Sequence, residues 1–231
     1  MQAIILAAGA GTRVGMNIPK CLIEINGATL LKNQIETLHR LDDTILVTVV
    51  TGYKNHLVEQ EIYKLRDIHP MIKTVYNTEA QNMGIVRSLE LAATTIVEDA
   101  VLRLSGDLFF GPEADLHALI RHSEDALAVQ RVPPSRNETV IIKNEDLVLT
   151  DVHSENDIEW LDIDYYANDS FKQVMNVSCW YIDGSQHYYQ LMRHAIKIGS
   201  YRPKHIEVGG VFEIDTMEDL DYVRRKFAGG C

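Results

Sequence analysis

The chain has 231 residues, of which 46% are hydrophobic and 24% are charged, as in an ordinary globular protein with one sizeable core. Its formal net charge of -11 disfavours a nucleic acid partner, because a polyanion would be repelled outside a local basic patch. The sequence contains no membrane-length apolar stretch, no signal peptide and no cysteine spacing typical of a metal site, so we expect a cytoplasmic protein with reduced thiols, either monomer or homodimer.

The first half of the chain alternates strand and helix signals. The strand signals are short apolar or β-branched runs, and the helix signals are apolar residues at helical spacing. In order, the predicted elements are a strand at 3–6, a helix at 30–41, a strand at 44–50, a helix at 56–66, a strand at 73–76, a helix at 85–96 and a strand at 100–104. This alternation predicts a mixed, mostly parallel sheet flanked by helices, with ligands at the carboxyl ends of the strands.

The second half is less regular and has the signature of a small antiparallel β lobe. The predicted elements are strands at 126–132, 139–143, 147–152 and 173–182, a helix at 185–198, and a last helix that Thr216 caps together with Asp219. Residues 155–172 are polar and aromatic without a clean period, so we expect a loop-rich lid there. The fold class that follows is α/β, a single Rossmann-like domain with an antiparallel lobe.

The first predicted strand leads into a run of small residues with two cationic side chains nearby. Small residues let a ligand approach the backbone, Arg13 suits a forked contact with phosphate oxygens, and Lys20 supplies a movable point charge. We therefore expect a nucleoside triphosphate site. The expected contacts in this loop are Leu6, Ala7, Ala8, Gly9, Gly11 and Thr12. The loop is not a P-loop, because no Gly-Lys-Ser/Thr follows, and it lacks the third glycine of the dinucleotide-binding motif.

Two acidic residues follow buried strands. Asp107 comes directly after Ser105 and Gly106 at the end of the strand at 100–104, and Asp215 ends an apolar run just before the last helix. Two carboxylates that converge on one point form a hard oxygen site that suits Mg²⁺. Asn82 lies ahead of the helix at 85–96, and its amide can both donate to and accept from the edge of a pyrimidine.

These motifs together resemble a known enzyme family. The LAAGxGTR start with Pro19-Lys20, the Gly-Asp after the central strand and the closing Phe-Glu-Ile-Asp-Thr are similar to nucleotidyltransferases that activate phosphorylated sugars and alcohols, above all bacterial phosphocholine cytidylyltransferases. The resemblance implies that Asp107 and Asp215 hold the catalytic Mg²⁺. It also implies that Gly84 and Ser88 border the base and ribose.

The resemblance further implies transfer of CMP from CTP to a small phosphorylated or phosphonate acceptor, such as phosphocholine or a related aminoalcohol, with release of pyrophosphate. Lys20, Arg13 and Asp107 would be the catalytic residues. Residues 1–125 would form the nucleotide-binding half, and residues 126–231 the acceptor-binding lobe and the metal-binding C-terminal part. Two stretches, 13–19 and 180–215, are shorter than in related enzymes, and the second removes part of the expected acceptor wall.

An acidic and aromatic set in the second half suits an ammonium group, which cation–π and charge contacts would hold. The expected acceptor contacts from this set are Glu159, Trp160, Tyr165 and Trp180. A sugar 1-phosphate or inositol phosphate would instead need neutral hydrogen-bonding side chains. Three alternatives therefore stay open: a nucleotidyltransferase for such an acceptor, a module that senses NTP without turnover, and a molybdopterin-type nucleotidyl transferase.

Overall fold

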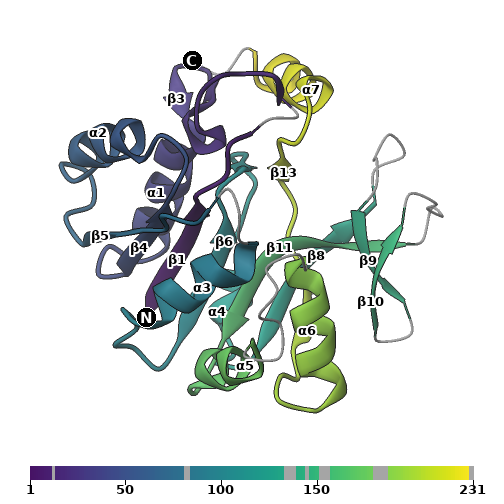
Figure 1. Cartoon of the computed structure of the whole chain (residues 1–231). Helices are drawn as coiled ribbons and strands as arrows, with labels where there is room; N and C mark the ends of the chain where they lie inside the picture. The colour runs from purple at the N-terminus through teal and green to yellow at the C-terminus, as the bar shows by residue number, and fades with distance from the viewer. Residues whose placement is uncertain are drawn as a thin grey trace.

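The computed structural model describes residues 1–11, 14–80, 84–132, 139–143, 146–150, 157–178 and 187–228. Its centre is one sheet whose strands follow the order β10-β9-β11-β6-β1-β4-β5, with β8 paired to β11 and β12 paired to β8 (Figure 1). The strands are β1 (Gln2–Ala7), β4 (Leu46–Thr51), β5 (Ile72–Tyr76), β6 (Val101–Ser105), β8 (Ala126–Arg131), β9 (Thr139–Lys143), β10 (Asp146–Thr150), β11 (Ile158–Tyr166) and β12 (Lys204–Glu207).

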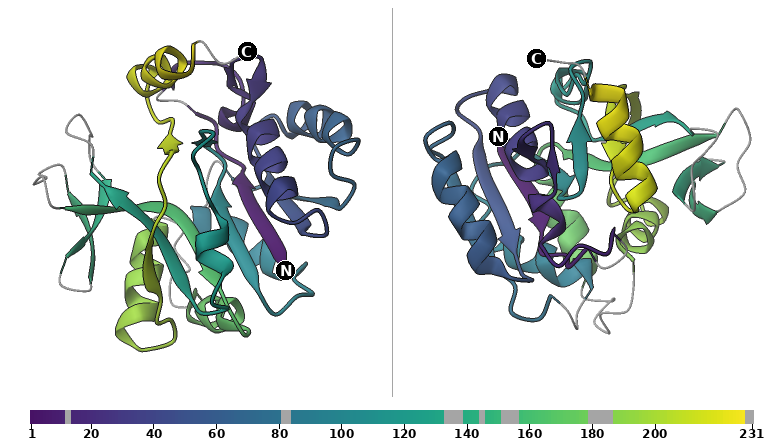
Figure 2. Two further views of the ribbon diagram at one scale, coloured as in Figure 1. Left: turned by 180° about the vertical axis from the view of Figure 1, so that it is seen from behind. Right: turned by 90° about the horizontal axis from the view of Figure 1, so that it is seen from above.

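The pairing pattern divides the sheet into a parallel and an antiparallel part. Strands β5, β4, β1 and β6 are parallel neighbours, whereas β11 runs antiparallel to β6, β8 and β9. The β9–β10 hairpin projects from the body at the edge opposite α2 (Figures 1 and 2). The predicted fold class, a Rossmann-like α/β sheet with an antiparallel extension, is confirmed.

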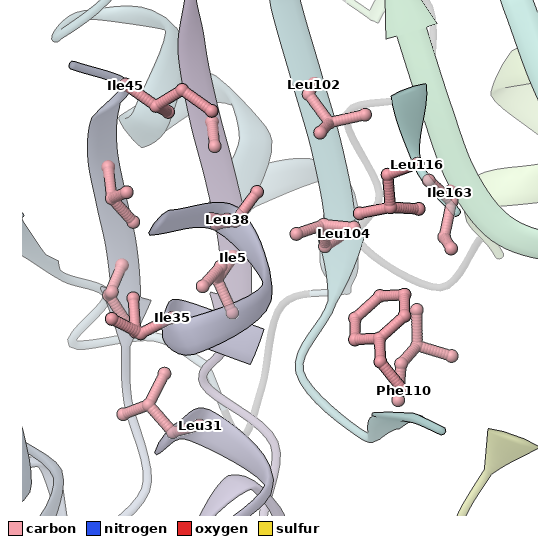
Figure 3. Packing of buried hydrophobic residues seen from close by; sticks show 14 of the residues in the cluster. Ile5, Leu31, Ile35, Leu38, Ile45, Leu102, Leu104, Phe110, Leu116 and Ile163 are labelled. Atoms are coloured by element: carbon pink, nitrogen blue, oxygen red, sulfur yellow. The ribbon is translucent and has the colours of Figure 1, made fainter. Parts of the chain in front are cut away.

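Helices cover both faces of the sheet. Helices α3, α5 and α6 cover one face, and α1 and α2 cover the other (Figure 1). Their bounds are α1 (Leu30–Leu41), α2 (Asn55–Leu65), α3 (Ile85–Ala93), α5 (Ser170–Ser178) and α6 (Tyr188–Lys197). Figure 3 shows Leu31, Ile35 and Leu38 of α1 packed toward Ile5 and Leu104 of the sheet, as the helical spacing of these residues predicts.

A second, smaller layer lies beyond the carboxyl ends of the parallel strands. It consists of the 3-10 helix η2 (Lys20–Leu22), the hairpin of β2 (Glu24–Ile25) and β3 (Ala28–Thr29), the pair β7 (Leu108–Phe110) and β13 (Val211–Glu213), and α7 (Met217–Phe227). Thr216 and Asp219 form the predicted capping box of α7. A short helix, α4 (His117–Ile120), follows β7. No helix among the described residues is both long and apolar enough to cross a membrane.

Two expectations for the second half were wrong. Within 155–172 lies β11, a nine-residue strand, and not a loop-rich lid. The polar residues of β11 interrupt the apolar pattern from which a strand would be predicted. They are buried in the sheet, where they pair with other side chains. Within 173–182, the described residues belong to α5 and are not a strand, because Phe171, Val174 and Val177 bury one helical face. Residues 179–182 lie outside the described part of the chain.

Candidate active site

The turn after β6 places Asp107 at the carboxyl end of the central strands. The backbone N–H of Gly106 donates to the carbonyl oxygen of Leu6 at 3.0 Å, which ties this turn to the end of β1. A Cβ at position 106 would stand 2.5 Å from that same oxygen, so the approach requires glycine. Asp107 therefore lies directly beside the small-residue loop that follows β1.

A short antiparallel pair brings Asp215 to the same place. Strand β13 pairs with β7 so that Glu213 lies opposite Leu108, and the N–H of Ile214 donates to the carbonyl oxygen of Asp107 at 3.0 Å. The chain then turns at Asp215 into the capped start of α7. Residues more than a hundred positions apart thus meet, as the sequence predicted for the two carboxylates.

Lys20 is held between these carboxylates. Its Nζ lies 2.8 Å from Oδ2 of Asp107 and also donates to Oδ1 of Asp215. Burial opposes the charge of Lys20, but the two carboxylates outweigh it and hold the pKa of Lys20 above its usual value. Burial likewise opposes the charge of Asp107, and Lys20 outweighs it, so the pKa of Asp107 is lowered. Both groups are therefore ionised at neutral pH.

Glu213 adds a third carboxylate that the sequence analysis did not single out. Oxygen atoms of Asp107, Glu213 and Asp215 all lie within 4.8 Å of one another. Oδ1 of Asp107 is buried without a hydrogen-bond partner. An all-oxygen donor set with an unsatisfied buried oxygen fits a hard divalent cation such as Mg²⁺. Alternation along the strand could have revealed Glu213, because it stands two residues before Asp215.

Two amide side chains of α1 support the Asp107 turn, and no sequence signal predicted this role. Gln34 is fully buried, and its Nε2 donates to the carbonyl oxygens of Ser105 at 3.1 Å and Leu108 at 2.8 Å. Asn33 exchanges two hydrogen bonds with the backbone of Phe110. These contacts fix the backbone on both sides of Asp107.

The small-residue loop follows Ala7, so that Leu6 and Ala7, predicted as loop contacts, are the last residues of β1. Leu6, Ala7 and Ala8 are buried, whereas Gly9 is exposed. Gly11 has φ +61°, a left-handed conformation that glycine adopts without strain, and a Cβ there would stand 3.1 Å from Cβ of Lys20. The loop and Lys20 therefore pack against each other. Thr12 and Arg13 lie outside the described residues.

A cavity of about 620 Å³ adjoins this loop, a volume in the usual range for small-molecule sites. Its lining residues are Ala8, Ala10, Gly15, Met16, Asn17, Tyr53 and Ala80. Two residues that follow β4 hold Asn17 in this lining: the Tyr53 hydroxyl donates to Oδ1 of Asn17 at 2.8 Å, and Nζ of Lys54 donates to the same oxygen at 2.9 Å. Neither residue was predicted, because both follow β4 outside any recognised motif.

Ala80, four residues before the N-cap of α3, lines this cavity. Gly84 is the N-cap of α3 in an extended conformation. Ser88 is buried, and its hydroxyl accepts a hydrogen bond from Nδ2 of Asn77 at 2.9 Å. Ser88 therefore faces inward, and Asn82 lies outside the described residues.

The predicted acceptor contacts do not form one group. Trp160 packs in the hydrophobic cluster with α3, α5 and α6, whereas Tyr165 packs in the cluster on the opposite face with α1 and α2. Glu159 is buried and accepts a hydrogen bond from Gln130. Trp180 lies outside the described residues.

Three residues of the acidic and aromatic stretch, Asp162, Asp164 and Trp160, surround a cation of the chain itself, Arg103. Together with Tyr188 they form what we call the Arg103 cluster. Arg103, on β6, is fully buried, and its guanidinium donates to Asp162 at 2.7 Å and to Asp164 at 2.6 Å. The same group lies 5.4 Å from the ring centre of Trp160 and 4.2 Å from that of Tyr188. Cation–π and charge contacts are both present, with Arg103 as the cation.

Residues 3–158 match the family described as the MobA-like NTP transferase domain. The chain belongs to this family. The resemblance to nucleotidyltransferases drawn from the sequence is thereby confirmed.

Individual relatives differ in nucleotide and acceptor. The chain is 31% identical over 112 residues to the UTP--glucose-1-phosphate uridylyltransferase AglF of Haloferax volcanii, which covers 47% of this chain and 44% of AglF. The chain spans 27% to 44% of the length of the first curated relatives that it matches.

Solved structures match nearly the whole chain. The CTP:phosphocholine cytidylyltransferase LicC from Streptococcus pneumoniae superimposes with a TM-score of 0.74 at 18% identity, covering 98% of both chains. The inositol-1-phosphate CTP transferase from T. maritima gives 0.71 at 19% identity, covering 99% of this chain and 96% of that one. At these identities the likeness shows the fold.

Proposed function

We propose that this protein is a Mg²⁺-dependent nucleotidyltransferase that moves CMP from CTP to a small phosphorylated or phosphonate acceptor and releases pyrophosphate. One observation carries the proposal: Lys20 lies between Asp107 and Asp215, with Glu213 nearby, at the end of a small-residue loop that borders a cavity. Cations and carboxylates at one point suit a reaction in which phosphate charge must be neutralised.

In the proposed reaction an ionised oxygen of the acceptor phosphate attacks the α-phosphorus of the nucleotide. The bond from the α-phosphorus to the bridging oxygen breaks, and pyrophosphate leaves with its electron pair. The attacking oxygen is already ionised near neutral pH, so no general base is required. Catalysis then depends on positioning and on charge neutralisation.

Each residue of the site has a part in this reaction. Asp107 and Asp215, with Glu213 beside them, would hold Mg²⁺. When bound there, the ion supplies charge neutralisation at the reacting phosphates. Lys20 and Arg13 would bind phosphate oxygens, and the loop from Leu6 to Thr12 would lie against the nucleotide. Gly84, Ser88 and Asn82 would border the base and ribose, near the cavity that Tyr53 lines.

The acceptor is the less constrained part of the proposal. LicC and the T. maritima enzyme are named for CTP and for a phosphorylated alcohol, which supports CTP and an acceptor such as phosphocholine or inositol phosphate. The likeness to AglF supports a second candidate, uridylyl transfer to a sugar 1-phosphate. Because the guanidinium of Arg103 already lies against the rings of Trp160 and Tyr188, an aminoalcohol acceptor would need another group of the protein to hold its ammonium.

Pyrophosphate release tests the proposal. Purified protein with Mg²⁺ is assayed with CTP, UTP, dTTP, ATP and GTP, each against phosphocholine, phosphoethanolamine, aminoethylphosphonate, inositol phosphate and sugar 1-phosphates. We expect turnover with CTP and a phosphorylated alcohol. Turnover only with UTP and a sugar 1-phosphate would select the second candidate, and NTP binding without turnover in the whole panel would make the protein a nucleotide sensor.

A further inference from the structure

Within the Arg103 cluster, one residue differs from the others in exposure. The side chains of Arg103 and Asp164 are 0% exposed, whereas the side chain of Asp162 is 25% exposed. Arg103 alone can balance only one of the two carboxylates. The cluster therefore presents a second carboxylate, that of Asp162, at its solvent-facing side.

The backbone holds Asp162 in an unusual conformation. Its φ of +55° is left-handed, a region that residues other than glycine, asparagine and aspartate rarely occupy. The residue lies where the pairing of β11 with β8 shifts register, between Trp160 and Asp164. Bulges of this kind redirect a side chain and are frequent next to functional sites. Here the ion pair with Arg103 fixes the direction of the Asp162 carboxylate.

The register of β11 places this bulge at the active-site end of the sheet. Strands β6 and β11 are antiparallel, and their last pair is Leu104 with Ile163. One step further along both strands leads to Ser105 on β6 and Asp162 on β11. Asp107, whose carboxylate holds Lys20, follows Ser105 by two residues along the chain. Asp162 thus lies beside the carboxyl end of β6, on the side away from the nucleotide loop after β1.

We propose that Asp162 is a specificity-determining residue that contacts the polar end of the acceptor, and that Arg103 positions it. This inference rests on the proposed nucleotidyltransferase function and deepens it. A carboxylate is only an acceptor of hydrogen bonds, so the acceptor group it recognises is a donor, either an ammonium or a hydroxyl. Of the two carboxylates that Arg103 contacts, Asp164 is buried and Asp162 is accessible.

The test compares two aspartates that share a conformation but not a location. Asp162→Gly removes the carboxylate at a position where glycine is unstrained, and Arg103 keeps its pair with Asp164. The matched control is Asp169→Gly. Asp169 also has a left-handed φ, +65°, but its N–H donates to the carbonyl oxygen of Asp99, ahead of the amino end of β6, and its side chain is 50% exposed.

Steady-state kinetics of pyrophosphate release give the readout, with the acceptor that wild type uses best. We expect Asp162→Gly to raise KM for the acceptor about tenfold or more, the scale of a lost hydrogen bond to a charged group. KM for the nucleotide should stay within twofold, and Asp169→Gly should match wild type in both. Wild type without turnover would defeat the proposed function itself. If wild type turns over and Asp162→Gly has the same acceptor KM as wild type, the proposed role of Asp162 is overturned, but the proposed function is not.

A conservative variant identifies the donor. Asparagine tolerates the left-handed conformation and keeps an oxygen that can accept a hydrogen bond, but it carries no charge. If the donor is an ammonium, Asp162→Asn raises the acceptor KM nearly as much as Asp162→Gly does. If the donor is a hydroxyl, Asp162→Asn stays close to wild type while Asp162→Gly does not. An increase in nucleotide KM alone in both variants would contradict contact with the acceptor.

Discussion

At the scale of single residues, the site depends on one cation shared by two acids. Lys20 is the only described side chain for which hydrogen bonds to both Asp107 and Asp215 are seen, and it packs directly against Gly11 of the loop. It therefore connects the carboxylates with the segment that we propose binds phosphate. Its removal should affect both catalysis and the titration of Asp107.

Substitution of Lys20 by methionine keeps the length of the side chain and removes its charge. We expect the rate of pyrophosphate release to fall on the order of 10²–10³, the scale of a lost preorganised electrostatic contact. The control is Lys32→Met on α1, whose ammonium is 3.8 Å from Glu36 at the surface. Lys32→Met should keep the wild-type rate, and a Lys20→Met enzyme with that same rate would remove Lys20 from the catalytic machinery.

The same variant should change how stability depends on pH. In the wild type the pKa of Asp107 is lowered, because Lys20 outweighs burial, so this carboxylate stabilises the fold above about pH 4 and loses that effect as pH falls through its folded pKa. In Lys20→Met burial acts without the ammonium and raises the pKa of Asp107. The charged carboxylate then destabilises the fold, more so as pH rises.

We therefore expect the difference in free energy of unfolding between wild type and Lys20→Met to narrow from pH 8 to pH 5. Urea unfolding with a chelator present measures it at both values. The difference between wild type and Lys32→Met should be the same at both. A Lys20→Met difference that widens toward pH 5 would mean that Lys20 does not govern the ionisation of Asp107.

At the scale of elements, α1 is what holds the catalytic turn in place. Gln34→Ala removes both hydrogen bonds to the carbonyls of Ser105 and Leu108. We expect a loss of about 1–3 kcal/mol in free energy of unfolding, since two buried carbonyls lose their partner, and a lower kcat because Asp107 is less firmly placed. Urea unfolding and steady-state kinetics measure the two effects.

The control is Gln173→Ala, an exposed glutamine on α5. It should change the free energy of unfolding by less than about 0.5 kcal/mol and leave kcat unchanged. If Gln34→Ala were as mild as this control, the Asp107 turn would not depend on α1.

The elements also show what the sequence could and could not predict. Helix α1, the parallel strands and the capping box of α7 agree with prediction because their apolar spacing or cap residues are local signals. Strand β11 was missed because partners of its buried acids, among them Arg103, Gln130 and Tyr188, lie far from those acids in sequence.

The residues of the candidate site likewise divide into those that local sequence signals predict and those that they do not. Lys20, Asp107 and Asp215 could be found because each stands next to a motif or a strand end. Gln34 could not, because a polar residue on an amphipathic helix is normally exposed, and its burial depends on the distant turn at Asp107. The division into two functional halves at residue 125, and the roles of Arg13, Thr12, Asn82 and Trp180, stay predictions.

At the scale of the whole molecule, the fold assembles the site from the two ends of the chain. The loop after β1 and Lys20 come from the first residues. Glu213 comes from the last strand, β13, which pairs with β7, and Asp215 comes from the turn that follows β13. The antiparallel strands add Asp162 on the other side of β6. Nucleotide and acceptor would thus meet over the end of the central strand, where Asp107 lies.

The measurement that tests this account most directly follows both products of one reaction. Wild type and Asp107→Asn are incubated with CTP, the preferred acceptor and Mg²⁺, or with a chelator in place of Mg²⁺, and pyrophosphate and the CMP-acceptor adduct are quantified by mass spectrometry. We predict equal amounts of the two products from wild type with Mg²⁺, and a loss on the order of 10²-fold with the chelator or in Asp107→Asn. Equal product from wild type and Asp107→Asn, or turnover that is indifferent to the chelator, would contradict a metal-dependent transfer centred on Asp107.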